Sequence, residues 1–477
     1  MMHAHTTTRS NDKRLRWIGL PAVVALLVGC ASAPPAAAPA ATTAPAAQAA
    51  APAATVAATT APAAAPAATV APAPTPDPGK FTYWGGLIFS DVANKMLVDK
   101  IKEWGKTKNI EVDVVMINQN ETQQKVSAAV EAGTMPDALD MGIDLMLLLS
   151  KNGQLDAVDE VFKSVGAAHG GWTPAAEKSV DPAVYGKIYG IPFGLSGNLI
   201  NRRNDLLSAK GFNDAPKTWE ELGKMAEAVN APPKVYGMGF ALSNVGDGNL
   251  TQTMLQGWGG RIADDAGKTC TIDSPETRAF LEWITGRYKV GLFPPGATTW
   301  DGAGDNKAYQ AGQAAFIANP GSVYLNIKAN DPELLAGSKY SGLPGGPKMT
   351  LQPYGPNVRV IPTGSKHKDL AKELMMYLAD DAFMKEYYAN AIYGPVLKSQ
   401  IDFPIFKESP VHLGLLDVAL NGTPPGFPEK NNAALAEFSS NFLIPKMIQR
   451  IVVDNKSIDD AVKETQGACQ AIYDKYK

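Results

Sequence analysis

Phe81-Thr-Tyr-Trp84-Gly-Gly, together with the apolar run from Ile110 to Ile117, is the stretch of sequence that decides the fold. The first segment is typical of a strand that ends in glycines. The spacing of Leu97, Ile101 and Trp104 predicts a helix between the two segments. The continuous run of β-forming residues that follows suits a strand buried on both faces. Strand, helix and strand in succession favour an α/β architecture with a largely parallel sheet.

The same alternation continues along the chain. A helix is expected from about residue 121 to Gly133, then a strand over residues 135–141, with Asp144 opening the next helix. Further on, Thr218 is the expected N-cap of a helix and Glu221 stands at the capping-box position. More strands are expected at residues 195–200, 236–242, 269–273 and 312–318. The C-terminal third is expected to be helical, at residues 368–378, 384–388, 413–420, 433–453 and 458–473.

The N-terminus has the features of an export signal. Four basic residues precede an apolar segment from Trp17 to Val28, which is too short to span a membrane. The segment ends in Leu27-Val28-Gly29-Cys30, which resembles the lipobox of bacterial lipoproteins, where the cysteine carries the lipid. An ordinary signal peptide with a chance cysteine is the alternative. We therefore expect a lipoprotein signal peptide over residues 1–29 and lipidation of Cys30.

Residues 30–79 are almost entirely Ala, Pro and Thr, with no charge before Asp77 and no aromatic residue. Such a composition buries too little apolar surface to offset the entropy of ordering, and its prolines prevent a stable helix. We expect a disordered tether that holds the folded part away from a lipid surface. A two-chain lipid on Cys30 would give stable attachment to the membrane.

Several functions are disfavoured by composition. The formal net charge of −3 and the absence of a basic stripe argue against nucleic-acid binding. The histidines are scattered and no phosphate-binding loop or nucleophile elbow occurs, so no metal, cofactor or catalytic residue is expected. Cys270 and Cys469 either form a disulfide, as exported proteins allow, or are buried free thiols.

A series of short motifs resembles one known family in order. These are Tyr83-Trp-Gly, Gly133-Thr-Met-Pro-Asp137, Tyr189-Gly-Ile-Pro-Phe193, Pro216-Lys-Thr-Trp-Glu-Glu221, Tyr309-Gln-Ala-Gly-Gln-Ala-Ala-Phe-Ile-Ala-Asn319-Pro-Gly321, Leu343-Pro-Gly-Gly-Pro347, Ser365-Lys-His-Lys-Asp-Leu-Ala-Lys-Glu-Leu374 and Asn455-Lys-Ser-Ile-Asp-Asp-Ala-Val462. Together they resemble the extracellular solute-binding proteins of ABC importers, of the type that includes maltose-binding protein and other sugar binders.

The resemblance implies a two-lobe, periplasmic-binding-protein-like (type II) fold with hinge-linked lobes and a helical C-terminal part. Lobe one is expected to comprise residues 80–194 and 313–345, and lobe two residues 195–312 and 346–477. A ligand would lie in the cleft between the lobes, beyond the carboxyl ends of strands, and the lobes would close on it by a hinge motion.

Aromatic side chains and short polar side chains at strand ends or on loops are the candidate ligand-binding residues. Aromatic faces stack on the C–H surfaces of sugars, and polar groups bind their hydroxyls. Asn319 lies near the place where the family has an aromatic contact, although here the aromatic residue is displaced to Tyr324. Packing or helix capping is the alternative role for several candidates. The set is Trp84, Asp140, Asp144, Ser196, Asn198, Trp258, Trp300, Asp301, Asn319, Tyr324, Tyr354 and Tyr393.

The expected function follows from the resemblance. We expect a monomeric, lipid-anchored binding protein on the extracytoplasmic face of the membrane, which delivers a sugar or oligosaccharide to the permease subunits of an ABC transporter. Two alternatives remain open at this point. One is a surface-anchored hydrolase, which would need two carboxylates facing each other across a cleft. The other is a sensor that presents its closed form to a receptor.

Overall fold

The computed structural model describes residues 79–88, 90–118 and 121–477. The expected signal peptide, Cys30 and all but the last residue of the expected tether lie outside these residues. Within them, no helix combines the length and the apolar character that crossing a membrane requires.

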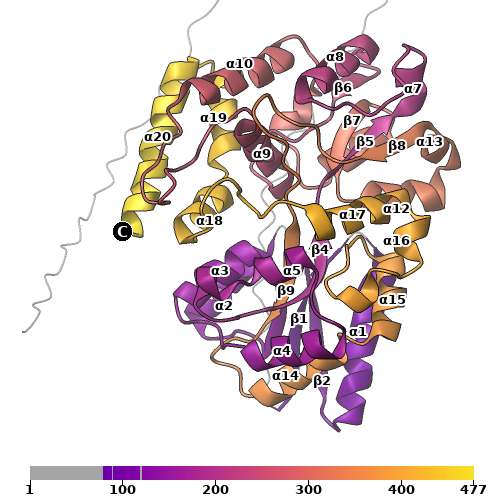
Figure 1. The fold of residues 1–477 in the computed structure, drawn as a ribbon, viewed down its shortest axis with the longest axis vertical. Helices are drawn as coiled ribbons and strands as arrows, with labels where there is room; N and C mark the ends of the chain where they lie inside the picture. The colour runs from indigo at the N-terminus through magenta and orange to yellow at the C-terminus, as the bar shows by residue number, and fades with distance from the viewer. Residues whose placement is uncertain (1–78, 89, 119–120) are drawn as a thin grey trace, which may run out of the picture. The chain divides into compact units, whose positions relative to one another are not determined.

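Two separate β-sheets organise the described residues (Figure 1). The first has the strand order β2-β1-β3-β9-β4 and the second the order β6-β7-β5-β8. Each sheet has its own hydrophobic core, and the helices of the lower and upper parts of Figure 1 pack around them. We call the two parts the first lobe and the second lobe. The strands are β1 (Phe81–Leu87), β2 (Val112–Asn118), β3 (Ala138–Gly142), β4 (Ile191–Ser196), β5 (Leu199–Arg203), β6 (Tyr236–Met238), β7 (Ala314–Asn319), β8 (Ser338–Ser341) and β9 (Gly355–Val360).

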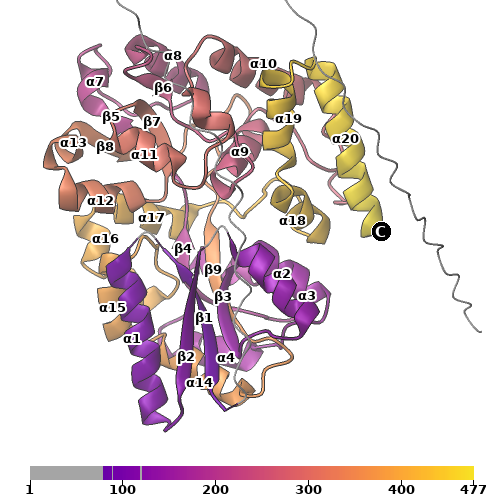
Figure 2. The same ribbon diagram turned by 180° about the vertical axis from the view of Figure 1, so that it is seen from behind.

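Helices cover both sheets, and Figure 2 shows α1 alongside β1 and β2 from behind. The α-helices are α1 (Asp91–Thr107), α2 (Thr122–Ala132), α3 (Ile143–Lys151), α4 (Asp159–Ala168), α5 (Pro174–Ser179), α6 (Pro182–Tyr185), α7 (Asn204–Ser208), α8 (Trp219–Val229), α9 (Leu250–Gly257), α10 (Pro275–Lys289), α11 (Gly304–Gln310), α12 (Ser322–Asn330), α13 (Pro332–Gly337), α14 (Lys368–Tyr377), α15 (Asp381–Asn390), α16 (Ile405–Glu408), α17 (Pro410–Asn421), α18 (Ala433–Ser440), α19 (Leu443–Val452) and α20 (Ile458–Lys475). The 3-10 helices of the described residues are η2 (Gly246–Asn249), η3 (Pro295–Thr298) and η4 (Lys398–Gln400).

Both sheets are mixed, so the expectation of a largely parallel sheet is wrong. In the first sheet β1 runs parallel to β2 and β3, whereas β9 runs antiparallel to both β3 and β4. In the second sheet β6 and β7 are parallel and β5 is antiparallel to β7 and β8. The β2 strand is also not buried on both faces, because it lies at the edge of its sheet and most of its residues are partly exposed.

The expected division of the chain between the lobes is wrong for two stretches. β7 and β8, within residues 313–345, pair with β5 and therefore belong to the second lobe. β9 and the helices α14 and α15 belong to the first lobe, because β9 pairs with β3 and β4 and both helices contribute to the first core. Pairing partners far apart in sequence decide lobe membership, and short motifs do not reveal them.

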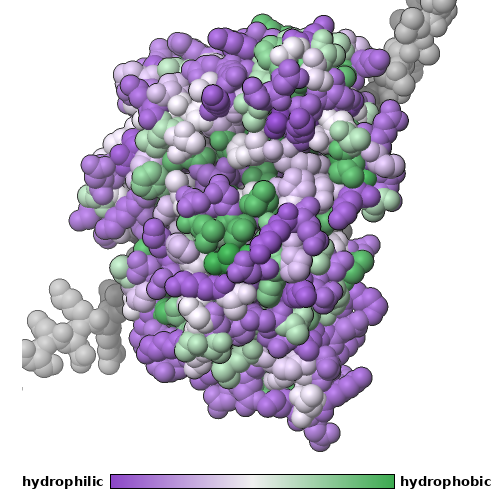
Figure 3. All heavy atoms as spheres, turned by 45° about the vertical axis from the view of Figure 1, so that its right-hand side comes forward, coloured by the Kyte–Doolittle hydropathy of each residue, from purple (hydrophilic) through white to green (hydrophobic). Residues whose placement is uncertain are grey.

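The chain passes between the two sheets several times. Gly197 and Asn198 join β4 to β5, residues 342–354 join β8 to β9, and residues 422–432 join α17 to α18. α17 lies between the lobes in Figure 1, where Val411 and Leu415 pack against Leu199 and Tyr324. Figure 3 shows apolar residues gathered at this height on an otherwise mostly hydrophilic face.

Local capping agrees with the sequence in several places. The Thr218 hydroxyl accepts a hydrogen bond from the Glu221 N–H over 3.1 Å, which confirms the predicted start of α8. Gly133 ends α2 with a left-handed φ of 64°. Residues 269–273, in contrast, form no named strand and contribute only an isolated bridge at Cys270.

One long predicted helix is broken. Residues 433–453 form α18 and α19, separated at Asn441 and Phe442, and Phe442 has a left-handed φ of 54°. This backbone conformation is uncommon for a residue with a bulky side chain and ends a continuous helix. The break turns out to place Phe442 at the candidate site.

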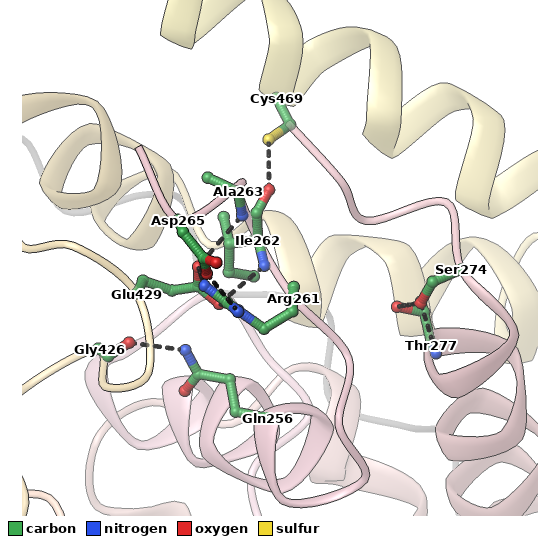
Figure 4. A network of polar contacts seen from close by, with 10 residues as sticks. All are labelled: Gln256, Arg261, Ile262, Ala263, Asp265, Ser274, Thr277, Gly426, Glu429 and Cys469. Atoms are coloured by element: carbon green, nitrogen blue, oxygen red, sulfur yellow. Dashed lines mark hydrogen bonds and ion pairs between the residues drawn. The ribbon is translucent and has the colours of Figure 1, made fainter. Parts of the chain in front are cut away.

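Two features attach the C-terminal helices to the second lobe. A disulfide joins Cys270 to Cys469 on α20, which decides between the two alternatives left open by the sequence. The buried Glu429 carboxylate, on the segment before α18, accepts hydrogen bonds from the Ile262 and Ala263 N–H groups and pairs with Arg261 (Figure 4). These links fix the segment that carries α18 and Phe442.

Candidate functional site

A cavity of about 830 Å³ lies between the two sheets, which is within the usual range for small-molecule sites. It is lined by residues of both lobes and of the connections between them. Leu87 and Ile88 come from the end of β1, Asn118 from the end of β2, and Asn319 from the end of β7. Strand ends therefore open into the cavity, as expected for ligand sites in α/β proteins.

Five of the sequence-based candidates line the cavity: Ser196, Asn198, Asn319, Tyr354 and Tyr393. Ser196 and Asn198 flank the crossing from β4 to β5, where the Ser196 hydroxyl donates to the Gly355 carbonyl over 2.8 Å. This bond joins the first crossing to the start of β9. Ser196 therefore helps to hold the two crossing segments together at the cavity wall.

Asn319 has a positioning role at the start of α12. Its Oδ1 accepts hydrogen bonds from the Gly321 N–H over 2.8 Å and the Val323 N–H over 3.3 Å, and its Nδ2 donates to Asn306 over 2.6 Å. The Asn306 amide in turn donates to the Ser322 hydroxyl. Because its amide is already bonded on both sides, Asn319 orients the cavity wall and offers little of its own hydrogen-bonding capacity to a ligand.

Tyr354 is the candidate with an unfulfilled polar group. The residue is 2% exposed, and its hydroxyl has no hydrogen-bond partner among the described residues. Burial raises the pKa of Tyr354 to about 12, so the hydroxyl keeps its proton. An unpaired buried hydroxyl is costly, which makes a ligand that pairs with it favourable.

The other seven candidates do not line the cavity. Trp84 is 2% exposed in the first core, and Trp258 is 6% exposed and packs against Phe280 and Trp283 in the second. Trp300 packs on Gly304 and Tyr324 lies in the apolar cluster beside α17. Their indole and phenol rings serve packing, the alternative role that the sequence left open.

The three remaining candidates are aspartates. Asp140 is 7% exposed and lies against Tyr83 and Arg359 inside the first lobe. Asp144 stands in the first turn of α3, outside the cavity lining, and is exposed. Asp301 is exposed and its carboxylate accepts a hydrogen bond from the Ala303 N–H.

Several cavity residues were not identified from the sequence. They are mainly amides and loop residues: Asn94, Gln123, Asn244, Val245, Gly246, Asp247, Gly302, Asn306, Asn357 and Phe442. Asn94 holds the end of β1, since its amide donates to the Ile88 carbonyl over 2.8 Å and accepts from the Ile88 N–H over 3.0 Å. The loop at residues 244–247 could have been found from Gly246-Asp247-Gly248, because these residue types favour turns.

The cavity wall of the second lobe carries two neighbouring carboxylates. Asp247 belongs to η2 and lines the cavity, and Asp305, at the start of α11, is 4% exposed. Burial raises the pKa of Asp247 to about 6. Burial and the charge of Asp247 raise the pKa of Asp305 to about 8. Asp305 therefore holds a proton at neutral pH.

The residues that the structure describes include no group of three or more His, Cys, Asp or Glu side chains that could hold a metal ion. Amide and hydroxyl side chains line the cavity together with Tyr354, Tyr393 and Phe442, a lining that suits a polar organic molecule.

Comparison with known proteins identifies the class. Residues 96–412 match the family model of bacterial extracellular solute-binding proteins, which is more than half of the chain. The chain therefore belongs to this family, whose members are binding proteins rather than enzymes and act outside the cytoplasm.

Two relatives are similar in sequence. A probable ABC transporter-binding protein of Deinococcus radiodurans is 30% identical over 268 residues, covering 52% of this chain and 62% of the relative's length, less than two thirds. The galactooligosaccharide-binding protein of Bacillus subtilis is 24% identical over 395 residues, covering 78% of this chain and 86% of that protein.

Solved structures share the fold. Maltose-bound MalE3 of T. maritima superposes with a TM-score of 0.72 at 23% identity, covering 82% of this chain and 99% of that one. A sugar transporter protein of Arthrobacter chlorophenolicus with bound laminaribiose has a TM-score of 0.71 at 15% identity, with coverages of 82% and 99%. The two-lobe, periplasmic-binding-protein-like fold predicted from the sequence is confirmed.

Proposed function

We propose that the cavity binds a sugar or oligosaccharide and that the protein delivers it to the permease subunits of an ABC transporter. The observation that carries the proposal is the cavity itself, which brings amide side chains together with Tyr354, Tyr393 and Phe442, and Tyr354 carries a buried hydroxyl without a described partner. Amides bind sugar hydroxyls and aromatic faces cover their C–H surfaces. The ligands bound in the structural neighbours, maltose and laminaribiose, support the same class of ligand.

Anchoring and domain motion are further parts of the proposal. The lipobox-like Leu27-Val28-Gly29-Cys30 supports a lipid anchor on Cys30, with residues 30–79 as the tether. The short crossings at residues 197–198 and 342–354 would act as the hinge, because they join the sheets and line the cavity in part. A monomer with one ligand site between its lobes is the expected working unit.

The test combines a ligand screen with a one-atom substitution. The full chain is screened by thermal shift against neutral oligosaccharides of glucose, galactose and mannose, and the dissociation constant (Kd) of each hit is measured by calorimetry. A bound ligand at a hundred times its Kd should stabilise the protein by roughly 2.7 kcal/mol. Tyr354→Phe should raise Kd by roughly 5- to 20-fold, because it removes the hydroxyl and keeps the ring.

Tyr473→Phe is the matched control. Tyr473 is also 2% exposed with an unpartnered hydroxyl, but it lies on α20, away from the cavity lining. Its substitution should leave Kd unchanged. A screen without a single stabilising sugar would contradict the proposal, and equal effects of the two substitutions would remove Tyr354 from the site.

A further inference from the structure

The charged side chains that line the cavity are all acidic. Among the described lining residues these are Asp91 and Asp247, and no Lys, Arg or His takes part. The remaining lining residues are amides, hydroxyl-bearing and aromatic residues, glycines and apolar residues. A site built for a carboxylate or phosphate usually offers Arg or Lys donors to it, since charge-assisted hydrogen bonds are the strong ones.

Asp247 and Asp305 are neighbouring acidic groups on the wall of the second lobe, and the proton on Asp305 leaves Asp247 as the charged one. Within the part of the chain that the structure describes, neither carboxylate forms an ion pair, and the charge of Asp301 adds to that of Asp247 at Asp305. Two carboxylates without a cation repel each other, which a proton or a donor group of a ligand relieves. A ligand anion beside Asp247 would place a second negative group at this wall.

The helix N-termini at the cavity carry partial positive charge, which nearby hydrogen-bond acceptors and an acidic side chain partly offset. α1, α12 and α19 begin at or beside lining residues, and each N-terminus carries roughly half a positive charge. In α1 the first turn contains Asp91, and Ser90 accepts a hydrogen bond from the Ala93 N–H. In α12, Asn319 already accepts from the Gly321 and Val323 N–H groups. Some of the N–H groups that α1 and α12 would offer to a ligand anion are therefore already bonded within the protein.

We infer that the cavity selects a carbohydrate that is uncharged or carries an amino group and rejects acidic sugars, with Asp247 as the specificity-determining residue. The inference rests on the proposed function, because it names the chemical class of ligand for that site. Hydroxyl and ammonium groups donate hydrogen bonds to the carboxylate of Asp247, whereas a uronate would face it with a like charge at short range.

The experiment compares matched disaccharides on the full chain. Sets based on glucose, galactose and mannose each contain the neutral disaccharide, its uronate and its amino analogue, and Kd is measured by calorimetry at pH 7.5. In every set that binds, we expect the uronate to bind at least about tenfold more weakly than the neutral sugar, and the amino analogue to bind at least as tightly. Raising the salt concentration should narrow the difference between uronate and neutral sugar.

Asp247→Asn should bring the Kd ratio of uronate to neutral sugar below roughly three, because the like charge is gone. Asp214→Asn is the control, since Asp214 is exposed on the segment between α7 and α8 and does not line the cavity. It should leave the ratio as in the unmodified protein.

The outcomes are distinguishable. A uronate that binds as tightly as its neutral partner, or a ratio that Asp247→Asn does not change, overturns the inference and leaves the proposed function intact. The ratio in the unmodified protein decides the matter by itself if the variant does not fold. Absence of binding by all three sets overturns the proposed function and the inference with it.

Discussion

The first lobe and the second lobe differ in whether their aspartates have a cation beside them. In the first lobe, Asp140 accepts a hydrogen bond from the Tyr83 hydroxyl and lies 3.6 Å from the Arg359 Nε, and the Arg359 guanidinium lies 4.0 Å from the centre of the Phe193 ring. In the second lobe, Asp247 and Asp305 have no such cation among the described residues.

This difference indicates which carboxylates hold the fold together and which are available to a ligand. The Asp140 cluster joins β1, β3, β4 and β9, so its hydrogen bonds tie the sheet together away from the cavity lining. Glu429 is a second partnered carboxylate, held by Arg261 and two backbone N–H groups. Asp247, by contrast, lines the cavity and forms no ion pair with a described residue, so a ligand can supply the missing partner. We therefore expect charge pairing to distinguish an acidic residue that serves packing from one that binds a ligand.

The largest expected effect comes from removing the cation of the first lobe. Arg359→Met leaves Asp140 as an uncompensated buried carboxyl, and we expect the free energy of unfolding to fall by roughly 3–5 kcal/mol. Urea unfolding followed by circular dichroism measures the change. Arg278→Met is the control, because Arg278 makes two surface ion pairs, with Asp273 and Asp459, and should cost about 1 kcal/mol or less. Equal losses in the two variants would erase the contrast between the lobes.

The second effect is a pH dependence in the second lobe. An unfolded Asp releases its proton near pH 3.8, whereas native Asp305 keeps it up to about pH 8. Between these pH values the native state binds more protons than the unfolded state, so stability falls as the pH rises. Asp305→Asn removes this loss of stability, because the amide does not titrate. We expect the variant to be more stable than the unmodified protein by on the order of 2–4 kcal/mol at pH 8.5, and equally stable near pH 3.5.

Urea unfolding at several pH values checks the prediction for Asp305. Asp301→Asn should give a difference from the unmodified protein that does not vary with pH in the same way, because Asp301 is exposed on the preceding loop. A constant difference between Asp305→Asn and the unmodified protein across the pH range would show that Asp305 is ionised in the native state like an ordinary surface carboxyl.

The smallest effect concerns the aromatic part of the cavity. Phe442 lines it from the break between α18 and α19, and its left-handed backbone means that the fold maintains an uncommon conformation there. Phe442→Ala should raise the Kd of a sugar ligand by roughly 5- to 20-fold through loss of stacking area. Phe442→Tyr, which keeps the ring, should stay within about threefold of the unmodified protein. Calorimetric titration measures both, and equal Kd values for Ala and Tyr would exclude stacking on Phe442.

Local patterns explain why much of the fold could be predicted. The Phe81–Leu87 strand, α1 and the α2 helix ended by Gly133 follow from periodicity and turn chemistry, which involve neighbours a few residues apart. The candidate site was harder. Trp84 and Trp258 stand beside glycines, a pattern that suits a ligand-binding aromatic residue. The same pattern suits packing, and both rings lie in the cores. Phe442 could not be found, because its segment has the apolar spacing of one continuous helix.

What the sequence determined by itself is the alternation of strand and helix, the caps, the two-lobe class of fold through its motifs, and the absence of a metal or catalytic motif. The tertiary structure alone decided that β7 and β8 join the second sheet, that Cys270 meets Cys469, and that Asp140 is compensated while Asp247 and Asp305 are not. The physical reason is the separation along the sequence over which each interaction acts. Backbone preference and periodicity act between near neighbours in sequence, whereas strand pairing, desolvation and charge compensation depend on groups that only folding brings together.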